Sequence, residues 1–422
     1  MRTAVATALL NLLMAGGPQA APHPPSSADA APPQGHLAIR SRTDLDAYLR
    51  DHAGAPTPFD ALPPGARERF FLSLGWGSSG LGSFDPGVLA DELPQERIDA
   101  ILQLFGEEIA GHAPGSRLPE GDHADAPPVA AGGIDALERR YNDFYRALRE
   151  RGDPDPATHA ARLGKRFDAL LADAYAAQAL QDIDDRHLAM LWNAAVAVAK
   201  LTTEPRHVAA LEAAFAESAR RSRGQPSGER LRAMRDVLLA SRRFDDARRF
   251  SERYSSPALP PLPEFVEPPD IRDRPPHGIW RMSTDGNRLS RESIDLSGTR
   301  ILVTAGCHFS LDAAGDISAD PVLGPAFAKH ASWLVLPPGV EDIDAVRDWN
   351  RRFPQAPALM IYDREGWPML ADWPMPEFHV VREGRIVESV TGWPRGDAHQ
   401  REALIGMLRR AGLLDQLRPG SP

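Results

Sequence analysis

The spacing of apolar and polar residues changes character along the chain, near residue 278. Before that point apolar residues recur at helical spacing, as in the stripe formed by Ile98, Ile101 and Phe105. After it, short apolar runs alternate with amphipathic segments, which is typical of strands alternating with helices. The pattern therefore predicts a multi-domain protein with an α-helical N-terminal part and a C-terminal α/β domain, in which helices flank a mixed sheet.

Stretches rich in proline, glycine and alanine divide this pattern into domains. Compositionally, they favour disorder or extended linkers over packed structure. From them we expect disorder at 22–36, a small helical domain at 37–110, a linker at 111–133, an array of helical hairpins at 134–255, a Pro-rich linker at 256–277 and the α/β domain at 278–418.

The expected helical hairpins resemble tetratricopeptide-type pairs, most clearly in the segment "LLASRRFDDARRFSERY". Their second helices carry alanine at positions suited to close packing. The pairs are spaced by about 40 residues, however, where tetratricopeptide repeats have about 34. The repeat family is therefore left open.

The N-terminus has the pattern of a secretory signal peptide. Arg2 precedes an apolar stretch at 4–15, and small residues at Ala20 and Ala21 mark a cleavage region. We expect residues 1–21 to be a signal peptide and the protein to be exported, to a periplasm. No later apolar run is long enough for a membrane span, so none is expected in the mature chain.

The net charge of −10 argues against a nucleic-acid partner. The thirteen histidines are scattered, so neither a metal site nor a cofactor is expected. Gly75, Gly77 and Gly80 match a dinucleotide-binding spacing, but the following "GSFDPG" suggests a Gly-rich connection between helices. His379 alternates with apolar residues and is expected to be half-exposed.

Cys307 is the only cysteine in the chain. It follows the apolar-leaning run at 301–304 and precedes a predicted helix, whose unpaired N–H groups and dipole would stabilise a thiolate. Ser310 could donate a hydrogen bond to that thiolate, and a charged His308 would add to the effect. The alternative is that Cys307 is a small buried residue at a strand end.

Three segments resemble, in the same order, a thioredoxin-fold protein of the exported TlpA/ResA type. They are "STDGNRLSRESIDLSGTRILVTAGC", the CxxS motif "CHFS" and "WPMPEFHVVREGRIVESVTGW". The resemblance covers about 145 residues. It implies that Cys307 is the nucleophile and that Ser310 replaces the second cysteine. It also implies that Pro376 is a cis-proline, and that the Met375 backbone and His308 face a bound peptide.

The departures from that family limit the chemistry. Ser310 excludes the internal disulfide on which dithiol exchange depends. Gly306 replaces an aromatic residue, and Ile301 replaces a buried acid. We expect single-thiol exchange with a cysteine-containing protein or a low-molecular-weight thiol. If the protein is an enzyme, we expect this exchange to be isomerase-like. We also expect a protein partner to bind the helical region. The alternative is a redox-inactive interaction protein in which both regions are docking surfaces.

Overall fold

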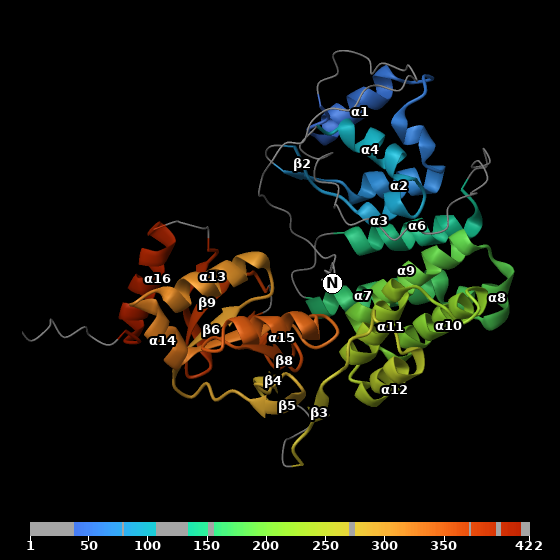
Figure 1. The fold of residues 1–422 in the computed structure, drawn as a ribbon. Helices are drawn as coiled ribbons and strands as arrows, with labels where there is room; N and C mark the ends of the chain where they lie inside the picture. The colour runs from blue at the N-terminus through green and yellow to red at the C-terminus, as the bar shows by residue number, and fades with distance from the viewer. Residues whose placement is uncertain are drawn as a thin grey trace, which may run out of the picture. The chain divides into compact units, whose positions relative to one another are not determined.

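The computed structural model describes residues 38–77, 80–106, 134–150, 156–269, 275–370, 373–393 and 398–414. The chain divides into two compact units, Met1–Arg151 and Gly152–Pro422, which are coloured from blue to red along the chain in Figure 1. The expected signal peptide at 1–21, disorder at 22–36 and linker at 111–133 lie outside the described residues.

The first unit is mainly helical. Its elements are α1 (Arg42–Asp51), η1 (Pro58–Ala61), α2 (Pro64–Ser73), β1 (Gly75–Gly77), β2 (Gly80–Ser83), α3 (Pro86–Ala90), α4 (Gln95–Gln103) and α6 (Ala136–Arg149). The core of this unit contains the rings of Phe59, Phe70 and Phe105, whose centroids lie 6.2 Å apart in each pair. The glycine-rich stretch expected to be a plain connection forms the antiparallel pair β1–β2.

Helix α6 packs on α2 within this first unit, whereas the sequence pattern grouped it with the later helical hairpins. The cause is a long-range polar contact. Arg69 is buried and donates to Glu138 Oε1 at 3.1 Å, to Asn142 Oδ1 at 2.7 Å and to Glu92 Oε1 at 3.3 Å. A buried guanidinium needs such partners, so this contact fixes α6 on α2.

The second unit begins with helices, as the sequence pattern predicts. They are α7 (Pro156–Leu171), η2 (Ala172–Tyr175), α8 (Ala177–Asp182), α9 (Asp185–Thr202), α10 (Pro205–Arg221), α11 (Gly228–Ala240) and α12 (Phe244–Tyr254). Helix α9 packs on α10 and α11 packs on α12, which are the two expected helical pairs. In the second helices Ala210, Ala214 and Ala247 are buried, where their small side chains permit close approach.

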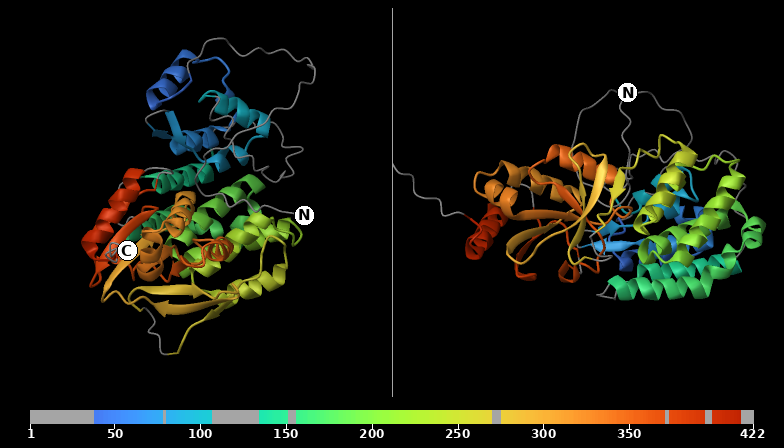
Figure 2. Two further views of the ribbon diagram at one scale, coloured as in Figure 1. Left: turned by 60° about the vertical axis from the view of Figure 1, so that its left-hand side comes forward. Right: turned by 90° about the horizontal axis from the view of Figure 1, so that it is seen from below.

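The rest of the second unit is built on an eight-stranded mixed sheet with flanking helices (Figure 2). Its strands are β3 (Glu264–Val266), β4 (Gly278–Met282), β5 (Arg288–Ser293), β6 (Thr299–Thr304), β7 (Ala331–Val335), β8 (Ala358–Ile361), β9 (Glu377–Arg382) and β10 (Arg385–Thr391). The helices are α13 (His308–Ala319), α14 (Leu323–His330), α15 (Ile343–Arg352) and α16 (Ala398–Ala411), with η3 (Pro368–Leu370).

The strand order is β10-β9-β6-β7-β8-β4-β5-β3. Strand β6 is parallel to β7 and antiparallel to β9, and β7 is parallel to β8. The apolar runs in β6 and β8 are buried because both strands lie inside the sheet, whereas β10 at the edge alternates between exposed and half-buried residues. Glu383 and Gly384 both have positive φ in the β9–β10 turn, as a two-residue type I′ hairpin turn requires.

The Pro-rich segment expected to be a linker is part of the second unit. Its strand β3 pairs in parallel with β5. The ring of Phe265 in β3 stacks on Phe244 of α12, with centroids 4.1 Å apart, and Trp280 of β4 lies edge-on to both rings. These aromatic contacts join the helices directly to the sheet.

A second contact between the helices and the sheet centres on Tyr362. Two guanidinium groups lie over its ring. The Cζ atom of Arg242, from the α11–α12 turn, is 4.0 Å from the ring centroid, and the Cζ atom of Arg291, from β5, is 3.7 Å from it. Arg242 also pairs with Asp363 at 3.2 Å. Cation–π and ion-pair contacts thus add to the aromatic contacts that join the helices to the sheet.

Candidate functional site

Cys307 lies where the central strand β6 passes into helix α13. Ala305 still bonds to β7, through its N–H to Leu334 O at 2.8 Å. Cys307 is then the N-cap residue of α13, with extended backbone angles, and its carbonyl accepts from the N–H groups of Ser310 and Leu311. The residue is half-buried. This placement matches the sequence expectation that the thiol stands at a helix N-terminus.

Two polar atoms lie at hydrogen-bonding distance from the sulfur. Cys307 Sγ is 3.4 Å from Ser310 Oγ and 3.4 Å from the carbonyl oxygen of Met375. The thiol can donate to the Met375 carbonyl, and the buried Ser310 hydroxyl can donate to the sulfur once the proton is lost. The arrangement therefore provides a partner for the sulfur in both protonation states.

The loop before β9 brings Met375 to the sulfur. The Met375–Pro376 peptide bond is cis. Thr304 at the end of β6 donates to the Pro374 carbonyl, and Gly392 N–H donates to the Pro376 carbonyl at 2.8 Å. The loop is thus bonded on one side to β6, the strand that precedes Cys307, and on the other side to the end of β10.

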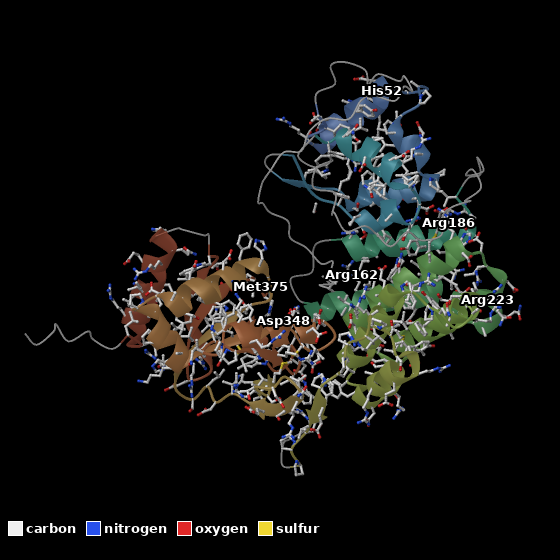
Figure 3. The ribbon with its side chains drawn as sticks, in the orientation of Figure 1. His52, Arg162, Arg186, Arg223, Asp348 and Met375 are labelled. Carbon is white, nitrogen blue, oxygen red and sulfur yellow. The ribbon has the colours of Figure 1, made fainter. Side chains whose placement is uncertain are left out.

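Among the hydrogen bonds of the described residues, none links His308 to the sulfur of Cys307. Its ring lies against Phe309, with centroids 3.8 Å apart. Phe309 and Met375 are each 38% exposed, which is unusual for large apolar side chains. Figure 3 labels Met375 on the second unit. The surroundings of the thiol are therefore partly apolar and open to solvent.

Glu341, which sequence reasoning missed, lies directly beside the thiol-bearing segment. A Cβ atom at Gly306 would be 3.1 Å from Glu341 Oε2 and 3.1 Å from Met375 Sδ. Gly306 also has a φ of +141°, which side-chain-bearing residues rarely adopt. The space of the aromatic residue found here in the resembled family is therefore occupied by a carboxylate and a thioether.

The surroundings of Glu341 favour its protonated form. The pKa of Glu341 is raised to about 7, mainly by burial; the Asp342 backbone N–H opposes this rise and the Asp342 carboxylate adds to it. The ion pairs found in the described part of the chain do not include Glu341. A carboxyl group with a pKa near 7 can both accept and donate a proton at neutral pH.

The loop that carries Glu341 is held by helix α11. A Cβ atom at Gly339 would be 2.1 Å from Asp236 O and 2.5 Å from Ala240 N, so this glycine lies directly on the helix backbone. Gly339 has a φ of +88°, which also favours glycine. The helical region thus sets the position of the loop that reaches Gly306.

His379 differs from the expectation that it is half-exposed. It is buried at 4% exposure because β9 lies between β6 and β10, and its Nδ1 is 2.7 Å from Ser389 Oγ on β10. Burial lowers the pKa of His379, and the Glu377 carboxylate opposes this. A neutral histidine that hydrogen-bonds to the neighbouring strand acts here as a structural residue.

A shallow hollow of about 660 Å³ lies at the other end of β9 from Pro376. Its lining includes His277, Ile294, Leu296 and Gly384. None of the residues proposed from the sequence lines it. The thiol and the hollow therefore belong to opposite ends of the sheet.

Within the described ranges, no group of three or more His, Cys, Asp or Glu side chains is arranged to hold a metal ion. In the same ranges, no helix combines the length and the apolar composition that crossing a membrane requires. Comparison of the chain with protein-family models, with curated proteins and with solved structures found no match.

Proposed function

We propose that residues 278–418 of the second unit form a thioredoxin-like domain that performs thiol–disulfide exchange through Cys307 alone. The observation that carries the proposal is the pair of 3.4 Å contacts of Cys307 Sγ, with Ser310 Oγ and with the Met375 carbonyl. A cis Met375–Pro376 bond beside the sulfur and the order β7-β6-β9-β10 support the resemblance from which the site was predicted. The proposed setting is an exported, periplasmic one.

The exchange begins with loss of the thiol proton from Cys307. The thiolate attacks one sulfur of a disulfide in a protein or in a small molecule. A bond forms between Cys307 and that sulfur, the original disulfide bond breaks, and the second sulfur leaves as a thiolate that takes up a proton. An external thiol then attacks the mixed disulfide and regenerates Cys307, so the protein returns to its starting state.

Ser310 determines how long the mixed disulfide lasts. In a dithiol enzyme the second cysteine resolves this intermediate, whereas a hydroxyl group cannot. The side chain of Ser310 lies on the first turn of α13, within 3.4 Å of the sulfur. The intermediate is therefore expected to persist until an external thiol arrives, which suits capture or isomerase-like exchange.

The variant Ser310→Cys tests this proposal. Wild-type protein treated with glutathione disulfide should keep one glutathione on Cys307 after removal of free reagent. The variant should lose that glutathione, form an internal disulfide and gain insulin-reducing activity in the presence of dithiothreitol. Intact-protein mass spectrometry measures both outcomes, with Cys307→Ala as the unreactive control.

The docking alternative makes the opposite prediction. If the protein acts only as an interaction surface, native Cys307 would take up no glutathione, and Ser310→Cys would gain no reductase activity.

A further inference from the structure

We infer that Glu341 is the group that exchanges protons with Cys307 and with the thiol that leaves during disulfide exchange. This inference rests on the proposed function and deepens it, because it assigns the proton transfers to a carboxylate from the β7–α15 loop. Its basis is geometric: Glu341 Oε2 lies against Gly306, the residue bonded to Cys307, 3.1 Å from where a Cβ atom would stand.

Two observations make this carboxylate suited to the role. Burial and the adjacent Asp342 favour a protonated Glu341, whose pKa is about 7. Among the described residues, Asp342 is the charged group next to the carboxylate, and Asp342 in turn interacts with Arg235, Asp236 and Asp344 on the side of α11 and α15. Lys200 pairs with Asp236 at 3.5 Å, so part of the charge on that side is already compensated.

The loop is also held firmly enough to present the carboxylate. Gly339 lies on the backbone of α11, and Val340 and Glu341 each donate a backbone N–H to the Pro337 carbonyl, at 3.1 and 3.0 Å. Asp342 then caps α15 by accepting from Asp344 N–H at 2.8 Å. The carboxylate is thus carried on a tight turn between an anchored glycine and a helix cap.

In this step one proton moves from Cys307 to Glu341 and then to the departing sulfur. The polar atoms at hydrogen-bonding distance from the sulfur are Ser310 Oγ and the Met375 carbonyl, so the proton passes through one water molecule. The ionised carboxylate of Glu341 takes the proton of the Cys307 thiol by this route, and the thiolate attacks the partner disulfide. The protonated carboxyl group then gives that proton to the departing sulfur, which leaves as a thiol. No electron donor other than the incoming thiol of the second half-cycle is needed, because one disulfide is formed for each one broken.

The variant Glu341→Gln, assayed with two disulfides, tests the inference. Departure of an alkyl thiol, as from glutathione disulfide, benefits from a proton, whereas the aromatic thiolate released from Ellman's reagent is stable without one. General acid–base groups contribute at least about a hundredfold in favourable cases, so we expect exchange with glutathione disulfide to slow by about tenfold or more. The reaction with Ellman's reagent should be unchanged or faster, because removal of a negative charge favours the thiolate.

Asp348→Asn is the matched control. It removes one carboxylate from the exposed side of α15 (Figure 3), where Asp348 pairs with Arg351, and both rates should stay as in the wild type. Glu341→Asp keeps a proton-bearing group and should recover part of the lost rate. Circular dichroism establishes that each variant is folded.

Equal rates for Glu341→Gln and wild type with both disulfides would overturn the inference, as would an equal loss with both, which would indicate a change in loop structure only. A wild-type protein that reacts with neither disulfide would instead overturn the proposed function itself, so the two failures are distinguishable.

Discussion

Each unit of the protein places a glutamate against a glycine, and the two contacts differ in what neutralises the carboxylate. In the first unit a Cβ at Gly65 would lie 2.1 Å from Glu138 Oε1, and Arg69 compensates that carboxylate at 3.1 Å. In the second unit a Cβ at Gly306 would lie 3.1 Å from Glu341 Oε2, and burial raises the pKa of Glu341 to about 7. A buried carboxylate paired with arginine holds two helices together, whereas one without such a partner is available for proton transfer.

The largest effect is expected from breaking the paired contact. Arg69→Ala removes the guanidinium that pairs with Glu92 and Glu138, and loss of one partner of a buried ion pair costs about 3–5 kcal/mol of unfolding free energy. Urea denaturation of the full chain measures this, followed through the transition of the first unit.

Arg67→Ala is the control in the same helix. Its ion pair with Asp60 is largely solvent-exposed and should contribute less than about 1 kcal/mol. Similar losses for the two variants would contradict a structural role for the buried pair.

The unpaired contact should show itself as a pH dependence of stability. Because the folded pKa of Glu341 is raised to about 7, the folded state binds this proton more tightly than the unfolded state does. Its contribution is therefore present at pH 4 and is lost as the pH rises to about 7. Glu341→Gln should be more stable than the wild type at pH 8, by about 1–3 kcal/mol, and the difference should shrink at pH 5.

Urea denaturation at the two pH values tests this, with Asp348→Asn as the control. A stability difference that does not change between pH 5 and pH 8 would show that Glu341 titrates normally in the folded protein.

An effect of similar size is expected from placing a methyl group between the carboxylate and the thiol segment. Gly306→Ala introduces a side chain at a φ of +141° and 3.1 Å from Glu341 Oε2, which should cost about 1–3 kcal/mol of unfolding free energy. It should also displace the carboxylate, so exchange with glutathione disulfide should slow. Gly298→Ala, where nothing lies within 4 Å of the added Cβ, should leave both stability and rate unchanged.

The sequence predicted the local structure around Cys307 because the signals there are local. The apolar run of β6 and the helix start at His308 each depend on neighbouring residues. Helix α6, in contrast, carries a strong apolar stripe that fits any helical neighbour. Its partner is chosen by Arg69, far away in the sequence, which no periodicity reveals.

The same limit applies to Glu341. Its segment "PPGVED" has the composition of an ordinary turn, and its approach to Gly306 depends on how β7 and α15 are placed by the sheet and by α11. The one available signal was Gly306, where the resembled family has an aromatic residue. That replacement indicates vacated space without naming the side chain that fills it. The burial of His379 likewise follows from the two strands beside β9.

Modification of Cys307 by glutathione disulfide in the absence of denaturant tests most directly whether this thiol is reactive in the folded protein. The account predicts one glutathione per chain, bound at Cys307 and absent from Cys307→Ala, formed in native protein at a rate at least equal to that in urea-unfolded protein. Modification that occurs only after unfolding would show a protected core residue and contradict the account.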